Sequence, residues 1–254
     1  MISTKADYVF REEDGTISIG AAQEGLYSAE FSDGTGATAT ITVSAIEWDG
    51  IWNVSIEQWS AGEIVSRTET RDNIDPYTGE IFEYEGSTSH DTTEYSYETD
   101  KEVVLDTQIA NEDLVCWKDL YGAGLADFDL TTVCGVGTYT TTFTAAEEGQ
   151  KILINLGAID GMVGLTVNGT KFVVDIDNCQ TDISKAVQEG ENEIVVTVCT
   201  TLTNTLTDGA ESLVRGMQES APYYPIVYKN CPESYGLTEP VQIIPYGTQV
   251  VYQG

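Results

Sequence analysis

The chain has 254 residues, of which 42 are acidic and 11 are basic, so its formal net charge is −31 at neutral pH. That length exceeds the usual size of one β-sandwich and allows two hydrophobic cores of ordinary size. The charge repels phosphate backbones and anionic lipids, which argues against nucleic acid and membrane surfaces as partners. It also favours a soluble monomer with a solvated acidic surface.

Residues 15–65 alternate between apolar and polar side chains with the period of two that is typical of half-buried strands. Glycines at positions 34, 36 and 50 separate the segments, because glycine accepts the positive φ of tight hairpins. The pattern predicts an antiparallel meander and places Val54 and Ile56 on the face opposite Trp59. The predicted strands are 16–19, 26–31, 38–43 and 52–59.

Residues 61–100 differ in composition, with many acidic and few aliphatic side chains. Such a segment cannot bury enough apolar area to offset the cost of ordering it, so we expect an exposed excursion or a hairpin that turns at Asp75-Pro76. His90, the one histidine, lies in this polar stretch. We interpret it as a surface residue rather than as part of a catalytic triad.

The second half of the chain again reads as strands and turns, with one short helical turn at 182–187 that Asp182 is placed to cap. Asn168-Gly169 is typical of a two-residue hairpin turn. We therefore predict an all-β fold with two β-sandwich domains, at 1–108 and 109–254, the second of them a jelly roll. Its predicted strands are 137–144, 151–156, 163–167, 170–174, 192–198 and 241–245.

Several short motifs in the second predicted domain carry a resemblance to a known family. Residues 135–143, 167–169, 182–184 and 235–241 are similar to the galactose-binding-like sandwich of glycoside hydrolases, as in the sugar-binding domain of family 2 enzymes. Residues 201–206 most resemble the C-terminal region of α-L-rhamnosidase-like proteins of glycoside hydrolase family 106. The resemblance covers about residues 110–247 and implies that the catalytic domain of such a protein lies outside this chain.

The resemblance implies a non-catalytic carbohydrate-binding or accessory module of a larger glycosidase-like protein, with a rhamnose- or galactose-containing glycan as ligand. Because the first residues lack the apolar segment of a secretion signal, we interpret the chain as a fragment of a longer secreted or cell-surface bacterial protein. One alternative is a purely structural pair of sandwiches that supports the missing catalytic domain. Another is an autonomous hydrolase, which needs two carboxylates facing each other across a sugar.

Aromatic rings pack against the apolar faces of sugars, and binding residues concentrate on loops of rigid sandwiches. We expect Trp48, Trp52 and Trp59 to pack in the core or between domains. No catalytic residue is predicted. The carbohydrate-binding residues predicted from loop position and residue type are Trp117, Tyr121, Asp160, Tyr223 and Tyr224.

Calcium often accompanies folds of the type that the resemblance implies, and carboxylate oxygens are the ligands it prefers. Asp175, Asp177 and Asp182 are the candidate calcium ligands in the second domain. An acidic surface loop explains the same three residues without a metal ion.

The five cysteines are Cys116, Cys134, Cys179, Cys199 and Cys231. Their odd number leaves at least one thiol free, and without a CxxC pair they do not indicate a zinc site. We expect most of them to be buried as small apolar side chains. One disulfide, for example between Cys116 and Cys134, stays open.

Overall fold

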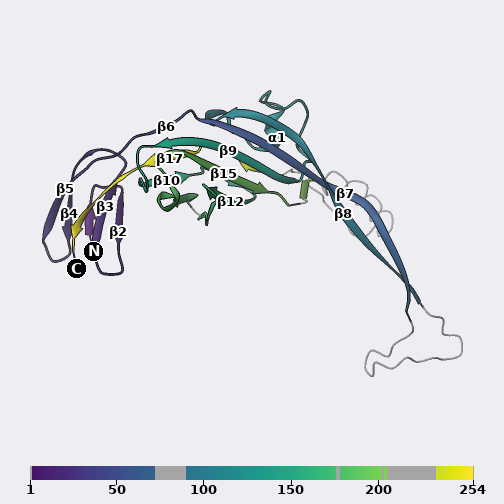
Figure 1. The fold of residues 1–254 in the computed structure, drawn as a ribbon, viewed down its shortest axis with the longest axis horizontal. Coiled ribbons are helices and arrows are strands. Elements are labelled where there is room, and N and C mark those ends of the chain that lie inside the picture. The colour runs from purple at the N-terminus through teal and green to yellow at the C-terminus, as the bar shows by residue number, and fades with distance from the viewer. Residues whose placement is uncertain (1, 72–89, 176–177, 202, 205–232, 254) are drawn as a thin grey trace, which may run out of the picture. The chain divides into compact units, whose positions relative to one another are not determined.

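The computed structural model describes residues 2–71, 90–175, 178–201, 203–204 and 233–253. These residues form antiparallel sheets with only short helical turns, which confirms the predicted all-β class (Figure 1). Contacts between residues group the chain into one compact unit, 1–57 with 103–254, and a second unit, 58–102. Neither unit ends at the predicted division between residues 108 and 109, which stays a prediction.

The first five strands of the chain and its last strand form two small antiparallel sheets of three strands each, in the orders β1-β4-β5 and β18-β3-β2. Ile19, Ala21, Ala29 and Ile41 are almost fully buried between them. The predicted continuous meander is wrong, because β3 pairs with β2 and with the last strand of the chain rather than with β4. The strands are β1 (Ile2–Thr4), β2 (Tyr8–Arg11), β3 (Ile17–Ala21), β4 (Gly25–Phe31), β5 (Gly36–Ile41) and β18 (Gly247–Tyr252).

A larger sheet has the strand order β13-β12-β15-β9-β7-β8, with β6 beside β9. Its centre is the long antiparallel pair of β9 and β15, in which Gly190 lies opposite Ala145 and Cys199 opposite Val136 (Figure 1). The strands are β6 (Ile46–Trp48), β7 (Ile51–Arg71), β8 (His90–Ala110), β9 (Gly135–Ala145), β12 (Met162–Val167), β13 (Thr170–Phe172) and β15 (Gly190–Cys199).

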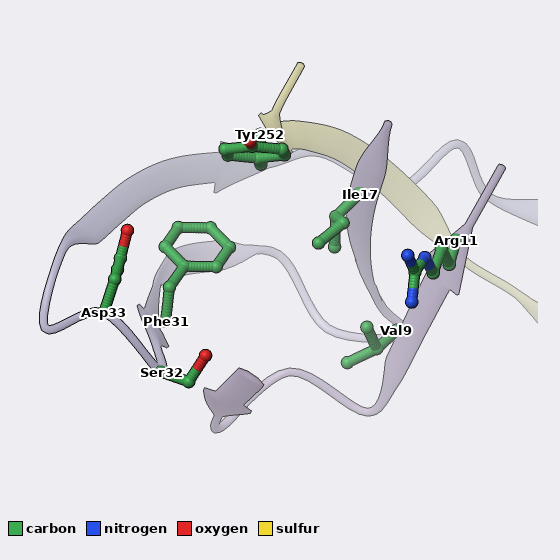
Figure 2. Close-up of a pocket in the computed structure, with 7 residues that line it drawn as sticks. All are labelled: Val9, Arg11, Ile17, Phe31, Ser32, Asp33 and Tyr252. Carbon is green, nitrogen blue, oxygen red and sulfur yellow. The ribbon is translucent and has the colours of Figure 1, made fainter. Parts of the chain in front are cut away.

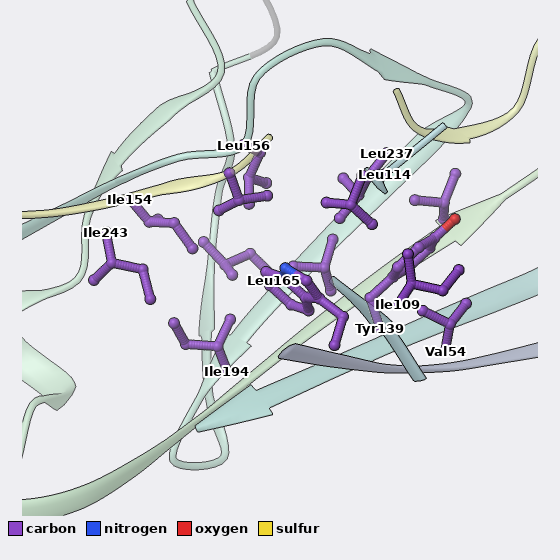
Figure 3. Close-up of a cluster of buried hydrophobic side chains, with 14 of the residues drawn as sticks. Val54, Ile109, Leu114, Tyr139, Ile154, Leu156, Leu165, Ile194, Leu237 and Ile243 are labelled. Atoms are coloured by element: carbon purple, nitrogen blue, oxygen red, sulfur yellow. The ribbon is translucent and has the colours of Figure 1, made fainter. Parts of the chain in front are cut away.

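A three-stranded sheet, β14-β10-β17, completes the sandwich. Its strands are β10 (Ile152–Asn155), β14 (Gln180–Asp182) and β17 (Gln242–Pro245). In Figure 3, Ile154 and Ile243 from this sheet share one buried cluster with Leu165 and Ile194 from the larger sheet. Each buried aliphatic side chain stabilises the fold by about 1.5–3 kcal/mol relative to exposure, so this shared layer holds the two sheets together.

The local turn signals in this sandwich are confirmed. Asn168 and Gly169 have φ values of 47° and 77°, and Val167 lies opposite Thr170, as a two-residue hairpin between β12 and β13 requires. The predicted helical turn is a short 3₁₀ turn, η2 (Ser184–Ala186), and the Asp182 carboxylate accepts a hydrogen bond of 2.9 Å from the Ser184 N–H. The remaining elements are η1 (Asn111–Asp113), α1 (Trp117–Leu120), β11 (Ile159–Asp160) and β16 (Gly236–Leu237).

The two strands β7 and β8 pair with each other and contain 21 residues each. Residues 61–71 and 90–100 of the acidic segment therefore lie in this pair of strands, and His90 is the first residue of β8. The predicted Asp75-Pro76 turn lies outside the described residues. In the part of β7 within the larger unit, Trp52, Val54 and Ile56 are fully buried, as the alternation predicts.

The disulfide considered between Cys116 and Cys134 is not formed, because both side chains are free thiols. Both are buried, as expected of small apolar residues, whereas Cys179 and Cys199 are half-buried. The Cys116 thiol donates a hydrogen bond of 2.8 Å to the Asp119 carboxylate. Burial, followed by the interaction with Asp119, raises the pKa of this thiol. Cys231 lies outside the described residues.

Gly137 gives a test of how tightly the sandwich is packed. A methyl group at this position would lie 2.5 Å from Cζ2 of the buried Trp117 ring. We expect Gly137→Ala to destabilise the protein by about 1–3 kcal/mol, because a rigid buried indole cannot move aside freely. The measurement is the urea midpoint of unfolding.

The matched control is Gly122→Ala, whose added methyl group would lie 3.5 Å from the carbonyl oxygen of Asp119, an ordinary contact distance. Equal urea midpoints for the two variants would contradict the packing around Gly137.

Candidate functional site

A pocket of about 310 Å³ opens at one end of the small sheets (Figure 2). Its lining comes from strands β2, β3 and β18 and from the end of β4 with the turn after it. Its lining residues are Val9, Arg11, Ile17, Phe31, Ser32, Asp33 and Tyr252.

A β-bulge places Tyr252 in this pocket. Val250 lies opposite Ser18, so regular pairing would put Val251 opposite Ile17, but the register shifts and Tyr252 takes that position. Because side chains alternate between the faces of a strand, one extra residue turns the tyrosine to the face that carries Ile17. The irregular pairing at the end of β18 therefore supplies one aromatic wall of the pocket.

Phe31 supplies the second aromatic ring. The ring centroids of Phe31 and Tyr252 are 5.6 Å apart and their planes are tilted by 53°. Tyr252 remains 49% exposed and Val9 44% exposed, so both side chains can contact a ligand. Figure 2 shows both rings on one side of the pocket and the aliphatic Val9 and Ile17 on the other. The result is an open, partly aromatic surface that water reaches.

Asp33 is held at the rim by the turn that joins β4 to β5. The Phe31 N–H donates to the Thr35 carbonyl at 2.8 Å, and Gly34 adopts a φ of 82° that suits glycine. The Asp33 carboxylate accepts hydrogen bonds from the Thr35 hydroxyl at 2.7 Å and from the Thr35 N–H at 3.0 Å. These bonds, the hydroxyl first, lower the pKa of Asp33, so it is an ionised acceptor at neutral pH.

Arg11 lies on the opposite wall from Asp33 (Figure 2). Its strand position is opposite Ile17, which in turn is opposite Tyr252, so the three residues form a row across β2, β3 and β18. The pocket therefore combines two aromatic rings, one guanidinium and one carboxylate. A guanidinium donates to oxygen atoms in a fixed fork, and a carboxylate accepts from hydroxyl groups, so the arrangement suits a polyhydroxylated ligand.

Trp117 is predicted from the sequence to contact sugar. The structure corrects this prediction, because the side chain lies in the core. Only 1% of its surface is exposed, and its indole N–H donates to the Tyr139 hydroxyl at 2.9 Å. Burial raises the pKa of Tyr139 to about 12, so its hydroxyl stays protonated. The ring also packs against Tyr235 with 6.3 Å between centroids, and it offers no open face to a ligand.

The other predicted carbohydrate-binding residues do not line the aromatic pocket. Tyr121 is 56% exposed after α1, and Asp160 is exposed on β11 opposite Gly236. The N–H of Trp117 donates to the carbonyl of Tyr235 at 2.8 Å, so α1 and Asp160 both lie beside β16. Tyr223 and Tyr224 lie outside the described residues. Sugar contacts by Tyr121 and Asp160 stay predictions.

The three candidate calcium ligands differ in their surroundings and in whether the structure describes them. Asp182 already has structural partners, since its carboxylate accepts hydrogen bonds from the Tyr246 hydroxyl at 2.6 Å and from the Ser184 N–H. Asp175 is exposed, and Asp177 is outside the described residues. Within the described part of the chain, no group of three His, Cys, Asp or Glu side chains is placed to hold a metal ion. Calcium binding stays a prediction.

The residues of the aromatic pocket were not singled out from sequence. The predicted strand 26–31 and the glycine at position 34 place Phe31 at a strand end beside a turn. Nothing local indicates that Tyr252 and Arg11 lie in the same place, because they come from opposite ends of the chain. The bulge that turns Tyr252 inward has no signature in its own sequence.

Comparisons with known proteins give a likeness in structure but none in sequence. No protein-family model and no curated protein matches the sequence. Among solved structures, a rhamnosidase from Novosphingobium sp. PP1Y is similar to this chain with a TM-score of 0.40 and 13% sequence identity. The alignment covers 98% of this chain and 25% of the rhamnosidase, so the chain spans about a quarter of that protein's length. At these values the likeness assigns neither a family nor an activity.

In the same described residues, no helix is long and apolar enough to cross a membrane.

The hydrogen bonds around Asp33 predict a measurable change in its pKa. Thr35→Val removes the hydroxyl donor and keeps the backbone donor, so the Asp33 pKa should rise toward its ordinary value without reaching it. A lowered pKa in the folded state contributes stability above the unfolded-state pKa, and this is lost as pH falls through the folded value. The variant should therefore lose part of that contribution at neutral pH. The measurement is an NMR titration of the aspartate carboxyl carbons.

Asp129 serves as the internal control in that titration. Its carboxylate accepts hydrogen bonds from the N–H and the hydroxyl of Thr131, and its pKa is likewise lowered. Its titration should be the same in both proteins. An unchanged Asp33 pKa in Thr35→Val would contradict the turn geometry.

Proposed function

We propose that this chain is a non-catalytic carbohydrate-binding or accessory module, and that the pocket at Phe31 and Tyr252 holds the sugar. The observation that carries the proposal is the pair of partly exposed rings, 5.6 Å apart, in one pocket with Arg11 and Asp33. Ligand pockets elsewhere combine the same ingredients, an apolar and aromatic lining with a few placed polar groups.

The chemistry of a sugar explains why both kinds of lining residue are needed. One face of a pyranose ring carries mainly C–H groups and packs against an aromatic ring, while its hydroxyls need hydrogen-bond partners. Phe31 and Tyr252 supply the first surface. Arg11 supplies donors, and the ionised Asp33 supplies an acceptor whose position is fixed by Thr35.

The charges of the pocket and of the whole protein favour neutral glycans over charged ones as the ligand of this pocket. One guanidinium and one carboxylate balance each other within it, while the net charge of −31 disfavours polyanions in general. The sequence resemblance of residues 135–143 and 235–241 to galactose-binding-like domains makes rhamnose- and galactose-containing glycans the first to test.

The proposed role is binding rather than hydrolysis. Asp33 is the one carboxylate among the residues that line the pocket, whereas most glycoside hydrolases place two carboxylates across the scissile bond. The proposal includes a longer parent protein, secreted and glycosidase-like, whose catalytic domain lies outside the residues of this chain. This part is supported by the sequence resemblance, and the length of the native reading frame tests it.

Substitution of the aromatic pair tests the binding site. Tyr252→Ala and Phe31→Ala should each weaken binding of the best ligand on a glycan array by about tenfold, because each removes one stacking surface. Isothermal titration with that glycan gives the dissociation constants. Thermal melting of each variant checks that it is folded.

Tyr121→Ala is the discriminating variant, because Tyr121 is an exposed tyrosine outside the pocket. It should leave the dissociation constant unchanged. Binding lost with Tyr121→Ala and retained with Tyr252→Ala would move the site to the loop after α1. Absence of binding to every glycan on the array would overturn the proposed function.

A further inference from the structure

A second pocket, of about 350 Å³, lies on the sandwich. It shares no lining residue with the pocket at Phe31 and Tyr252. It is lined by Gly149, Lys151, Asp182, Ser184 and Lys185. Two of the 11 basic residues of a strongly acidic protein therefore line one hollow. No described contact of the chain pairs either lysine with a carboxylate at ion-pair distance. Both lysines are exposed.

Backbone hydrogen bonds fix the segments that carry these lysines. The Ile183 N–H donates to the Ile152 carbonyl at 3.0 Å, and the Ile152 N–H donates to the Ser184 hydroxyl oxygen at 3.0 Å. The Gly149 N–H donates to the Val187 carbonyl at 3.0 Å. These bonds join the start of β10 to η2, so Lys151 and Lys185 project from one rigid frame.

The Lys185 side chain is further positioned by an aromatic ring. Its Nζ lies 4.7 Å from the centroid of Phe172, a cation–π distance. Phe172 itself does not line the pocket. The contact restrains the long, flexible side chain of Lys185, which reduces the conformational entropy lost when a ligand binds.

Asp182 gives the pocket an acceptor beside the two cations. One of its oxygens accepts from the Tyr246 hydroxyl at 2.6 Å and the other from the Ser184 N–H at 2.9 Å. A carboxylate has about four lone-pair sites, so this exposed group keeps acceptor capacity on the pocket side. Among the five lining residues, two ammonium groups and one carboxylate leave an excess of one positive charge.

We infer that this pocket binds the carboxylate of a uronic acid sugar, with Lys151 and Lys185 on the carboxylate and Asp182 on a ring hydroxyl. The excess positive charge matches a single carboxylate, and Asp182 disfavours a compact multivalent anion while it accepts from hydroxyls. The volume suits a ligand the size of one sugar ring. The net charge of −31 keeps long polyanions away. This site uses none of the residues of the aromatic pocket and goes beyond the function proposed above.

The test is titration of the full chain with four probes: sodium glucuronate, glucose, acetate and sulfate. Glucuronate should bind, glucose should not bind measurably at this site, and acetate and sulfate should bind at least tenfold more weakly than glucuronate. Chemical shifts of Lys151 and Lys185 in NMR spectra locate the binding.

Lysine variants separate this site from a general charge effect. Lys151→Met and Lys185→Met keep the aliphatic stem and should each weaken glucuronate binding by about tenfold, because each removes one charge-assisted contact. Lys171→Met removes an exposed lysine that does not line the pocket and should leave binding unchanged. Melting temperatures confirm that the variants are folded.

Three results would overturn the inference. They are no binding of glucuronate, equal weakening by all three lysine variants, and binding of sulfate or acetate as tight as that of glucuronate. The variant Tyr252→Ala distinguishes a failure of this inference from a failure of the proposed function. It should weaken neutral-glycan binding at the aromatic pocket by about tenfold and leave glucuronate binding as in the unmodified chain.

Discussion

The pairing of β18 with β3 is the interaction on which both candidate sites depend. It ties the last strand of the chain to its first sheets directly after β17 has joined the sandwich. Tyr246, between the two strands, is 4% exposed and contacts both parts. Its N–H donates to the Lys151 carbonyl at 3.0 Å, its hydroxyl donates to Asp182, and its ring stacks on Phe10 at 5.7 Å. Burial, then Asp182, raises the pKa of Tyr246, which keeps this hydroxyl a donor.

Close packing around this junction leaves little freedom for its sequence. A methyl group on Gly247 would lie 2.0 Å from the Thr42 carbonyl oxygen, and one on Gly20 would lie 2.9 Å from the Phe10 ring. Gln150 ties the same region to the connection before β6, because its amide donates to the Ser44 carbonyl and accepts from the Ala146 N–H at 2.8 Å. Such buried amides stabilise one arrangement because an unpaired polar group would cost free energy there.

The buried polar groups of the sandwich follow the same rule. Asn192 is fully buried, and its amide exchanges hydrogen bonds with Gln188 and also accepts from Asn168 at 2.7 Å. Among the described residues, no buried side-chain nitrogen or oxygen lacks a hydrogen-bond partner. The sandwich therefore provides a rigid support, and the candidate binding groups are found at its surface pockets and at the open end of the small sheets. Rigid supports reduce the entropy lost when a ligand binds.

The sequence by itself determined the elements with a local signature. The period of two placed β4, β9 and β15 and buried Val54 and Ile56, and Asn168-Gly169 determined a hairpin, because alternation and positive φ are properties of neighbouring residues. Only the tertiary structure decided which strands pair. The return of β18 to β3, the bulge that turns Tyr252 toward Phe31, and the burial of Trp117 all depend on contacts between distant segments. Residue type and spacing do not encode such contacts locally, so the pockets could not be assembled from the sequence.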